Sequence, residues 1–190
     1  MCSRYSLTSP PESVRATFGY EAEVDFPPRY NIAPSQPVVI LRLDLKGARE
    51  LALVRWGLIP SWVKDPREFT TLINARGETV VDKPSFRGAM RHRRCLVPAD
   101  GFYEWTGPAK ARIPHMFRPR GGGLMAMAGL WEHWLGADGS EIETMAILTV
   151  PANRTVAPLH DRMPLILKPD LFDLWLDCRP GDANPVTHLM

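Results

Sequence analysis

The feature that most limits how this chain folds is a succession of short apolar segments, each closed by glycine, proline or aspartate. The sequence has 19 prolines and 14 glycines among its 190 residues. Neither residue is well tolerated inside a long helix or a central strand, so together they divide the chain into short elements. Such a succession predicts strands joined by tight turns. It does not predict a helical bundle.

The expected elements follow from the apolar pattern between these breaks. Ser9-Pro10-Pro11-Glu12 predicts a capping box that opens a helix ending near Phe18. A short helix is expected over 85–90, and an amphipathic helix over 169–177 that buries Leu171, Phe172, Leu174 and Trp175. Loops are expected over 25–37, which holds four prolines, over the aromatic stretch 56–62 and over 71–79. Strands are expected at 38–43, 51–55, 94–97, 101–105, 115–118, 124–131, 142–150 and 163–167.

Strands separated by tight turns, with few helices, predict an α+β fold. We expect a single domain over residues 1–190, with mainly antiparallel strands closed into a barrel-like core and a few short helices. The longest apolar run, 124–131, is too short to cross a bilayer. Three widely spaced cysteines (Cys2, Cys95 and Cys178) suit a reducing compartment and lack a zinc-binding spacing. We therefore expect a cytoplasmic protein without membrane contact, metal or other cofactor.

Charge is unevenly distributed along the chain. Residues 1–120 hold 19 lysines and arginines against 12 acidic residues, whereas residues 121–190 hold 4 against 9. Of the 23 basic residues 18 are arginine, whose planar guanidinium suits phosphate. The pattern is typical of a protein with a polyanionic partner at its N-terminal part. A genome rich in arginine codons explains it equally well.

Cys2 follows Met1 directly, and cysteine is small enough for methionine aminopeptidase to expose it. Removal of Met1 leaves an α-amine that titrates near ~8 and a thiol near ~8.5, so both have a reactive fraction at neutral pH. Such a 1,2-aminothiol cleaves amides as a nucleophile. It also captures aldehydes, first as a Schiff base and then as a thiazolidine ring. The alternative is an ordinary residue at a frayed terminus.

Two further motifs carry candidate acid–base and polar groups. Asn74-Ala75-Arg76-Gly77-Glu78 places an amide, a guanidinium and a carboxylate at alternate positions, which share one face of an extended chain; the alternative is a surface turn. Glu104 lies between Tyr103 and Trp105, and apolar neighbours raise a carboxyl pKa toward that of a general acid. The alternative for Glu104 is a strand residue in contact with water.

The motif His160-Asp161-Arg162 combines a histidine that shuttles protons near neutral pH with an arginine suited to phosphate. The alternative for His160 is a packed or surface histidine. The basic run 91–94 lacks interleaved aromatic residues, so we interpret it as a solvated basic face and not as a recognition patch.

Taken together, these stretches resemble the SOS-response-associated peptidase (SRAP) family, whose members crosslink to abasic sites in DNA and shield them. The matching pieces occur in the family's order and span nearly the whole chain. They are Met1-Cys2-Ser3-Arg4, Tyr30-Asn31-Ile32-Ala33-Pro34, Trp56-Gly57-Leu58-Ile59-Pro60-Ser61-Trp62, Asn74-Ala75-Arg76-Gly77-Glu78-Thr79, Cys95-Leu96-Val97-Pro98-Ala99-Asp100-Gly101-Phe102-Tyr103-Glu104-Trp105 and His160-Asp161-Arg162-Met163-Pro164.

The resemblance implies a monomeric abasic-site sensor, cytoplasmic and nucleoid-associated when bound to DNA. Its self-processed Cys2 would bond covalently to the abasic sugar in single-stranded DNA, with crosslinking or lyase-type activity. By motif, Asn74 would position the reacting groups, Glu104 would be the acid–base group and His160 its proton partner. Residues implied to contact DNA are Arg4, Pro34, Trp62, Arg76, Trp105, Thr149 and Arg162.

One position departs from the family, which usually has glycine where this chain has Ser3, so the fine placement of Cys2 is open. A rival interpretation is an N-terminal-cysteine peptidase or amidase that uses the same residues, with Asn74 as oxyanion donor. A non-covalent single-strand binding module would need neither Cys2 nor Glu104.

Overall fold

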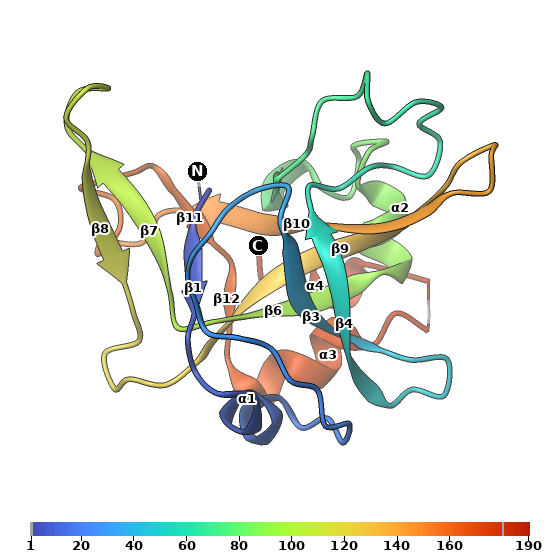
Figure 1. Cartoon of the computed structure of the whole chain (residues 1–190), viewed down its shortest axis with the longest axis horizontal. Helices are drawn as coiled ribbons and strands as arrows, with labels where there is room; N and C mark the ends of the chain where they lie inside the picture. The colour runs from blue at the N-terminus through green and yellow to red at the C-terminus, as the bar shows by residue number, and fades with distance from the viewer. Residues whose placement is uncertain (1, 180) are drawn as a thin grey trace.

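Five strands close into a barrel in the computed structural model, which describes residues 2–179 and 181–190. Around the barrel the order is β10–β4–β3–β6–β9 and back to β10 (Figure 1). The pairing is antiparallel except between β10 and β4. The predicted fold class is therefore confirmed. The barrel strands are β3 (Pro37–Leu43), β4 (Arg49–Trp56), β6 (Arg94–Ala99), β9 (Met125–Leu135) and β10 (Glu141–Pro151).

Helices cover the barrel where β6 runs. All six residues of β6 are buried, because α2 (Arg87–His92) and α3 (Phe172–Leu176) pack against it. The Trp175 indole N–H donates to the Cys95 carbonyl at 2.9 Å. Arg94 is also buried, and its guanidinium donates to the carbonyls of Met90, Trp175 and Asp177. A buried cation is tolerated here because its donors are satisfied. The remaining C-terminal helix is α4 (Asn184–Thr187).

A second, four-stranded sheet stands beside the barrel in the order β2–β1–β7–β8. Its strands are β1 (Tyr5–Leu7), β2 (Arg29–Ile32), β7 (Gly101–Thr106) and β8 (Ile113–Phe117). The β7–β8 hairpin projects beyond the barrel (Figure 1). β5 (Asn74–Arg76) pairs parallel with the C-terminal half of β10, which also pairs with β11 (Arg162–Pro164); β12 (Ile166–Leu167) pairs with β9. None of the helices within the described residues combines the length and apolar character that crossing a bilayer requires.

The predicted capping box is wrong. α1 (Pro11–Phe18) begins after Pro10 without a side-chain cap. The Ser9 and Thr8 hydroxyls instead donate to the Asp100 carboxylate at 2.5 and 2.7 Å. Burial opposes ionisation of Asp100, but these hydrogen bonds outweigh it and lower the pKa of its carboxyl. Ser9 therefore ties the start of α1 to the junction of β6 and β7.

Three further local expectations need correction. The segment 25–37 contains β2, and 71–79 contains β5 followed by a 3₁₀ turn, Gly77–Thr79. Strands this short are stabilised by their neighbours in the sheet, so local sequence does not reveal them. Within 169–177 only Phe172–Leu176 is α-helical, and Leu174 is exposed where burial was expected.

Candidate functional site

Cys2 lies where three distant parts of the chain meet, just before β1. The Asn74 side-chain amide of β5 donates to the Cys2 carbonyl at 2.9 Å. The backbone N–H of Tyr103 in β7 donates to the Arg4 carbonyl at 3.0 Å, toward which the Cys2 thiol also points at 3.9 Å. Cys2 is fully buried. It is therefore a packed residue and not part of a frayed end.

The Cys2 thiol is neutral in this environment. Burial, followed by the negative charge of Glu104, raises its pKa to about 12. This corrects the expectation of a thiol that is partly ionised near neutral pH. Reaction through sulfur therefore needs a base that accepts the thiol proton. Glu104 is therefore near enough to Cys2 for its charge to act on the thiol, so the structure brings these two predicted site residues together.

Glu104 faces inward from β7. Side chains alternate along a strand, and Phe102 and Glu104 are buried whereas Tyr103 and Trp105 are half-buried. His115 of β8 is the cross-strand partner of Glu104, so the two residues share a face. The ring Nε2 of His115 lies 2.8 Å from the Thr106 hydroxyl.

Two hydrogen bonds fix the backbone just before Asn74. The Trp56 indole N–H donates to the Ile73 carbonyl at 2.9 Å, and the Ile147 N–H donates to the same oxygen at 3.1 Å. The Trp56 ring also packs on Tyr5, with 5.4 Å between centroids. Trp56 thus joins the strand that follows Cys2 to the residue that precedes Asn74.

The Arg162 side chain is hydrogen-bonded to other residues of the protein. Its guanidinium donates to both carboxylate oxygens of Glu78, one at 2.8 Å, and to the Thr149 carbonyl at 2.6 Å. The arginine lowers the pKa of the Glu78 carboxyl. Glu78 lies in the 3₁₀ turn after β5, so the expected single face of Asn74, Arg76 and Glu78 does not form. A phosphate at Arg162 would compete with Glu78.

His160 is oriented by its backbone. Its Nδ1 accepts the N–H of Arg162 at 2.9 Å and lies 2.9 Å from the Asp161 carboxylate. The first contact uses Nδ1 as an acceptor, whereas the second brings a carboxylate acceptor to the same nitrogen. Together the two contacts hold the His160 ring beside Arg162.

The other residues expected at DNA differ in exposure. Trp62 is 58% exposed, with its ring edge-to-face to Phe69. Arg76 is exposed and forms no ion pair with a described residue, whereas Arg4 donates to the Ser3 carbonyl at 2.7 Å. Pro34 and Trp105 are half-buried. Thr149 is fully buried, and its hydroxyl donates to the Ala75 carbonyl at 3.4 Å. It therefore supports Arg162 and β5 and offers no exposed surface to DNA.

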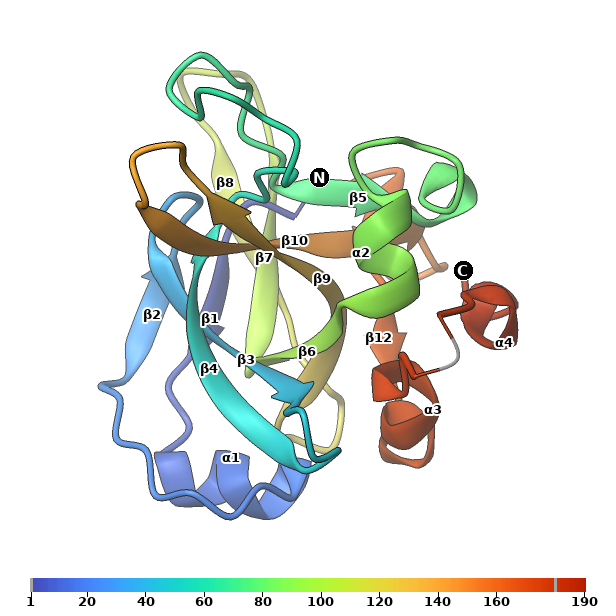
Figure 2. The same ribbon diagram turned by 90° about the vertical axis from the view of Figure 1, so that its right-hand side faces the viewer.

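Two projecting segments flank the N-terminal end of the chain. The N-terminus lies between the β7–β8 hairpin and the loop 57–73 that carries Trp62, and both project to the same side of the barrel (Figures 1 and 2). Within the described residues no group of three or more His, Cys, Asp or Glu is arranged to hold a metal ion.

Comparison with known proteins gives consistent matches. The family described as SOS response associated peptidase (SRAP) matches residues 1–190. The chain is 37% identical over 194 residues to the abasic site processing protein YoqW of Bacillus subtilis (strain 168), covering 100% of this chain and 86% of the relative. It is 31% identical over 223 residues to the abasic site processing protein HMCES of Xenopus tropicalis, covering 93% and 66%. A Bacteroides thetaiotaomicron crystal structure matches with a TM-score of 0.88 and 27% identity, covering 99% and 86%.

Proposed function

Because the chain belongs to the SOS response associated peptidase (SRAP) family, we propose that it processes abasic sites in DNA, the activity that the names of its relatives state for them. We propose further that Cys2, once Met1 is removed by self-processing or an aminopeptidase, bonds covalently to the abasic sugar in single-stranded DNA. The observation that carries this proposal is the buried Cys2, whose carbonyl accepts the Asn74 amide and whose thiol is near enough to Glu104 for that charge to raise its pKa.

The proposed reaction has two bond-forming steps. The Cys2 amine attacks the aldehyde carbon of the ring-opened sugar, and loss of one water gives a Schiff base. The thiol then adds to the same carbon, its proton leaves sulfur, and the former imine nitrogen gains a proton. The product is a thiazolidine, and the net reaction releases one water. No oxidant or cofactor is required.

Each proton transfer has a candidate residue. Glu104 lies close enough to Cys2 to raise the pKa of its thiol, so it is placed to accept the thiol proton or to protonate the departing water. His160 serves as the partner of Glu104 in proton transfer at the sugar oxygen. The Asn74 amide fixes the Cys2 backbone and therefore the direction of its amine.

The strand would be held by phosphate and base contacts around this centre. Arg4 and Arg76 are the candidate phosphate contacts, together with Arg162 after exchange with Glu78. The exposed ring of Trp62 suits stacking of an unpaired base. We propose that the protein acts as a monomer, in the cytoplasm, where single-stranded DNA is exposed.

The proposal is tested by denaturing electrophoresis after mixing the protein with single-stranded DNA that carries one abasic site. The parent should give a shifted band, whereas Cys2→Ala and a protein with a blocked N-terminus should give none. Mass spectrometry of the parent should show loss of Met1. Equal crosslinking by blocked and processed protein would exclude the aminothiol mechanism and return attention to a peptidase.

A further inference from the structure

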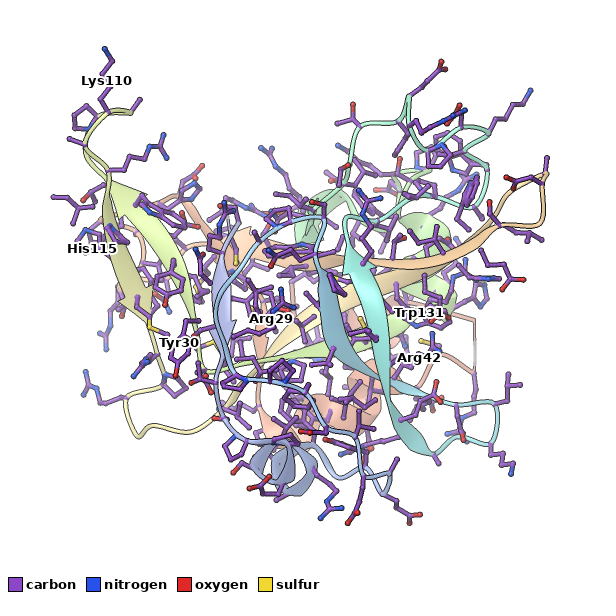
Figure 3. All side chains as sticks on the ribbon, viewed as in Figure 1. Arg29, Tyr30, Arg42, Lys110, His115 and Trp131 are labelled. Atoms are coloured by element: carbon purple, nitrogen blue, oxygen red, sulfur yellow. The ribbon has the colours of Figure 1, made fainter. Side chains whose placement is uncertain are left out.

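The β7–β8 hairpin is a defined arm. Its strands pair over five residues on each side, and the Thr106 hydroxyl is hydrogen-bonded to Nε2 of His115 on the opposite strand. At the tip the Ala111 N–H donates to the Pro108 carbonyl at 2.9 Å. Gly107 has a φ of 86°, and a Cβ there would lie 2.6 Å from the Ala111 carbonyl oxygen, so the turn requires glycine. The tip, with Lys110, stands away from the barrel (Figure 3).

The arm carries uncompensated positive charge. No acidic residue occurs between Glu104 and Glu132, whereas Lys110, Arg112, Arg118 and Arg120 lie in that interval. Lys110 and Arg112 are exposed, and neither forms an ion pair with any residue that the structure describes. Several arginines elsewhere in the molecule pair with carboxylates, among them Arg42, Arg49 and Arg162.

Arg42 is the contrasting case, on the opposite side of the barrel (Figure 3). Its guanidinium pairs with Glu50 and Glu143, both at 2.6 Å, and covers the ring of Trp131 at 4.2 Å. Cations that are left unpaired on a projecting turn produce a positive potential that attracts an anionic partner.

The arm is placed to meet a strand that passes Cys2. Glu104 lies on β7 itself, so the strand that carries the acid–base candidate continues directly into the tip. The N-terminus lies between this arm and the loop with Trp62 (Figure 1). From Glu104 to Pro108 an extended chain spans about 13 Å, which places the tip beside nucleotides that flank the lesion and away from the lesion itself.

From this placement we propose that the tip of the β7–β8 hairpin is a binding site for the phosphodiester backbone of single-stranded DNA flanking the reacting nucleotide, with Lys110 and Arg112 as the contacts. The identity of the strand rests on the proposed function. The site contributes affinity and leaves the chemistry at Cys2 unchanged, because it lies too far away to contact the sugar.

The test compares Lys110→Gln/Arg112→Gln with a matched control, Lys46→Gln/Lys168→Gln, whose lysines are exposed and belong to other surfaces. Binding of an undamaged single-stranded oligonucleotide is measured by fluorescence anisotropy over a range of salt. With about 0.7 counterions released per contact, each lost contact weakens binding about 5-fold at 0.1 M salt and reduces the log–log salt slope by about 0.7. The hairpin variant should therefore bind about 25-fold more weakly and the control as the parent.

Crosslinking completes the test. At saturating DNA the hairpin variant should react at the parent rate, and a trinucleotide with a central abasic site should react equally with both proteins. Binding equal to that of the control would overturn the proposal, as would a loss confined to duplex DNA or a slower rate at saturation. A parent that binds through the hairpin and forms no crosslink would refute the proposed function and leave this site standing.

Discussion

The side-chain amide of Asn74 donates a 2.9 Å hydrogen bond to the carbonyl oxygen of Cys2. The two residues lie 72 positions apart in sequence, and the bond fixes the backbone of Cys2, whose amine is the proposed nucleophile. It also joins β5 to the N-terminal strand of the other sheet. The Trp56 indole holds the residue before Asn74, so the donor has little freedom to move.

Asn74→Asp keeps the shape of the side chain and removes the donor. One hydrogen bond contributes about 1 kcal/mol, so we expect crosslinking at saturating DNA to slow ~5-fold while binding of undamaged DNA is retained. Single-turnover electrophoresis measures the rate. Asn184→Asp adds the same charge on α4 and should have the parent rate. An unchanged rate in Asn74→Asp would remove Asn74 from the mechanism.

Glu104→Gln tests proton transfer by this side chain, because glutamine keeps its shape. The amide cannot exchange a proton at neutral pH, and general acid–base help is worth ~10²-fold or more. We therefore expect crosslinking to slow by about that factor with binding intact. Glu141→Gln, which changes an exposed carboxylate on β10, is the control. If Glu104→Gln reacts faster, the carboxylate acts only by raising the pKa of the Cys2 thiol.

The salt dependence of binding tests the phosphate contacts next to Cys2. Arg4, Arg76 and Arg162 together contribute about −2 to the log–log slope on single strands, in addition to the share of Lys110 and Arg112, and Arg76→Ala should lose about 0.7. Arg162→Ala should lose less than Arg76→Ala, because Glu78 already compensates Arg162. Filter binding over a salt series measures both slopes. Equal losses would show that DNA displaces Glu78 completely.

Local sequence predicts the strands that have a clear apolar run of their own and end at a recognisable turn. The apolar runs over 38–43 and 51–55 define β3 and β4, and their antiparallel pairing follows from the turn at Asp44, whose carboxylate accepts the N–H groups of Lys46 and Ala48. β5 has three residues and exists because β10 offers an open edge. Its local sequence therefore looks irregular.

In the candidate site, too, some features can be predicted from local sequence and others cannot. Cys2, Glu104 and His160 are recognisable from residue type and motif. Their mutual placement is not, because the pairing of β1 with β7 and of β5 with β10 connects residues far apart in the chain. Burial of Cys2 is a property of that assembly, and so is the rise in the pKa of its thiol. The position of His115 beside Glu104 could not be predicted from sequence, because only the register of the β7–β8 hairpin brings the two residues together.

Because its thiol is buried, Cys2 should make the free energy of unfolding fall as the pH becomes alkaline. Its pKa is raised from 9.0 to about 12 in the folded state, so the folded protein keeps a proton that the unfolded chain loses. The contribution to stability is fully present below pH 9 and is lost as the pH rises toward 12. At pH 10 the loss from Cys2 is about 1 kcal/mol. Urea unfolding in reductant at pH 8 and 10 should show a smaller loss in Cys2→Ser than in the parent; equal losses would contradict the shift.

The same Cys2→Ser variant separates the two halves of the proposed reaction. The serine keeps the α-amine but replaces sulfur with a hydroxyl that is a much weaker nucleophile. A Schiff base with the sugar aldehyde should still form, whereas ring closure through oxygen should be slow and reversible. Without reductant the variant should leave little adduct after heating, and the parent adduct should survive.

Borohydride added during the reaction should reduce the imine of Cys2→Ser and restore a heat-stable band on a denaturing gel. Cys178→Ser, which alters a thiol beside Arg94 and leaves the N-terminus intact, serves as the control and should behave as the parent. Heat-stable adducts of Cys2→Ser without borohydride would show that sulfur does not make the linkage durable. If borohydride traps nothing, the amine is not the first nucleophile, and an amide-cleaving role for Cys2 becomes the better explanation of this site.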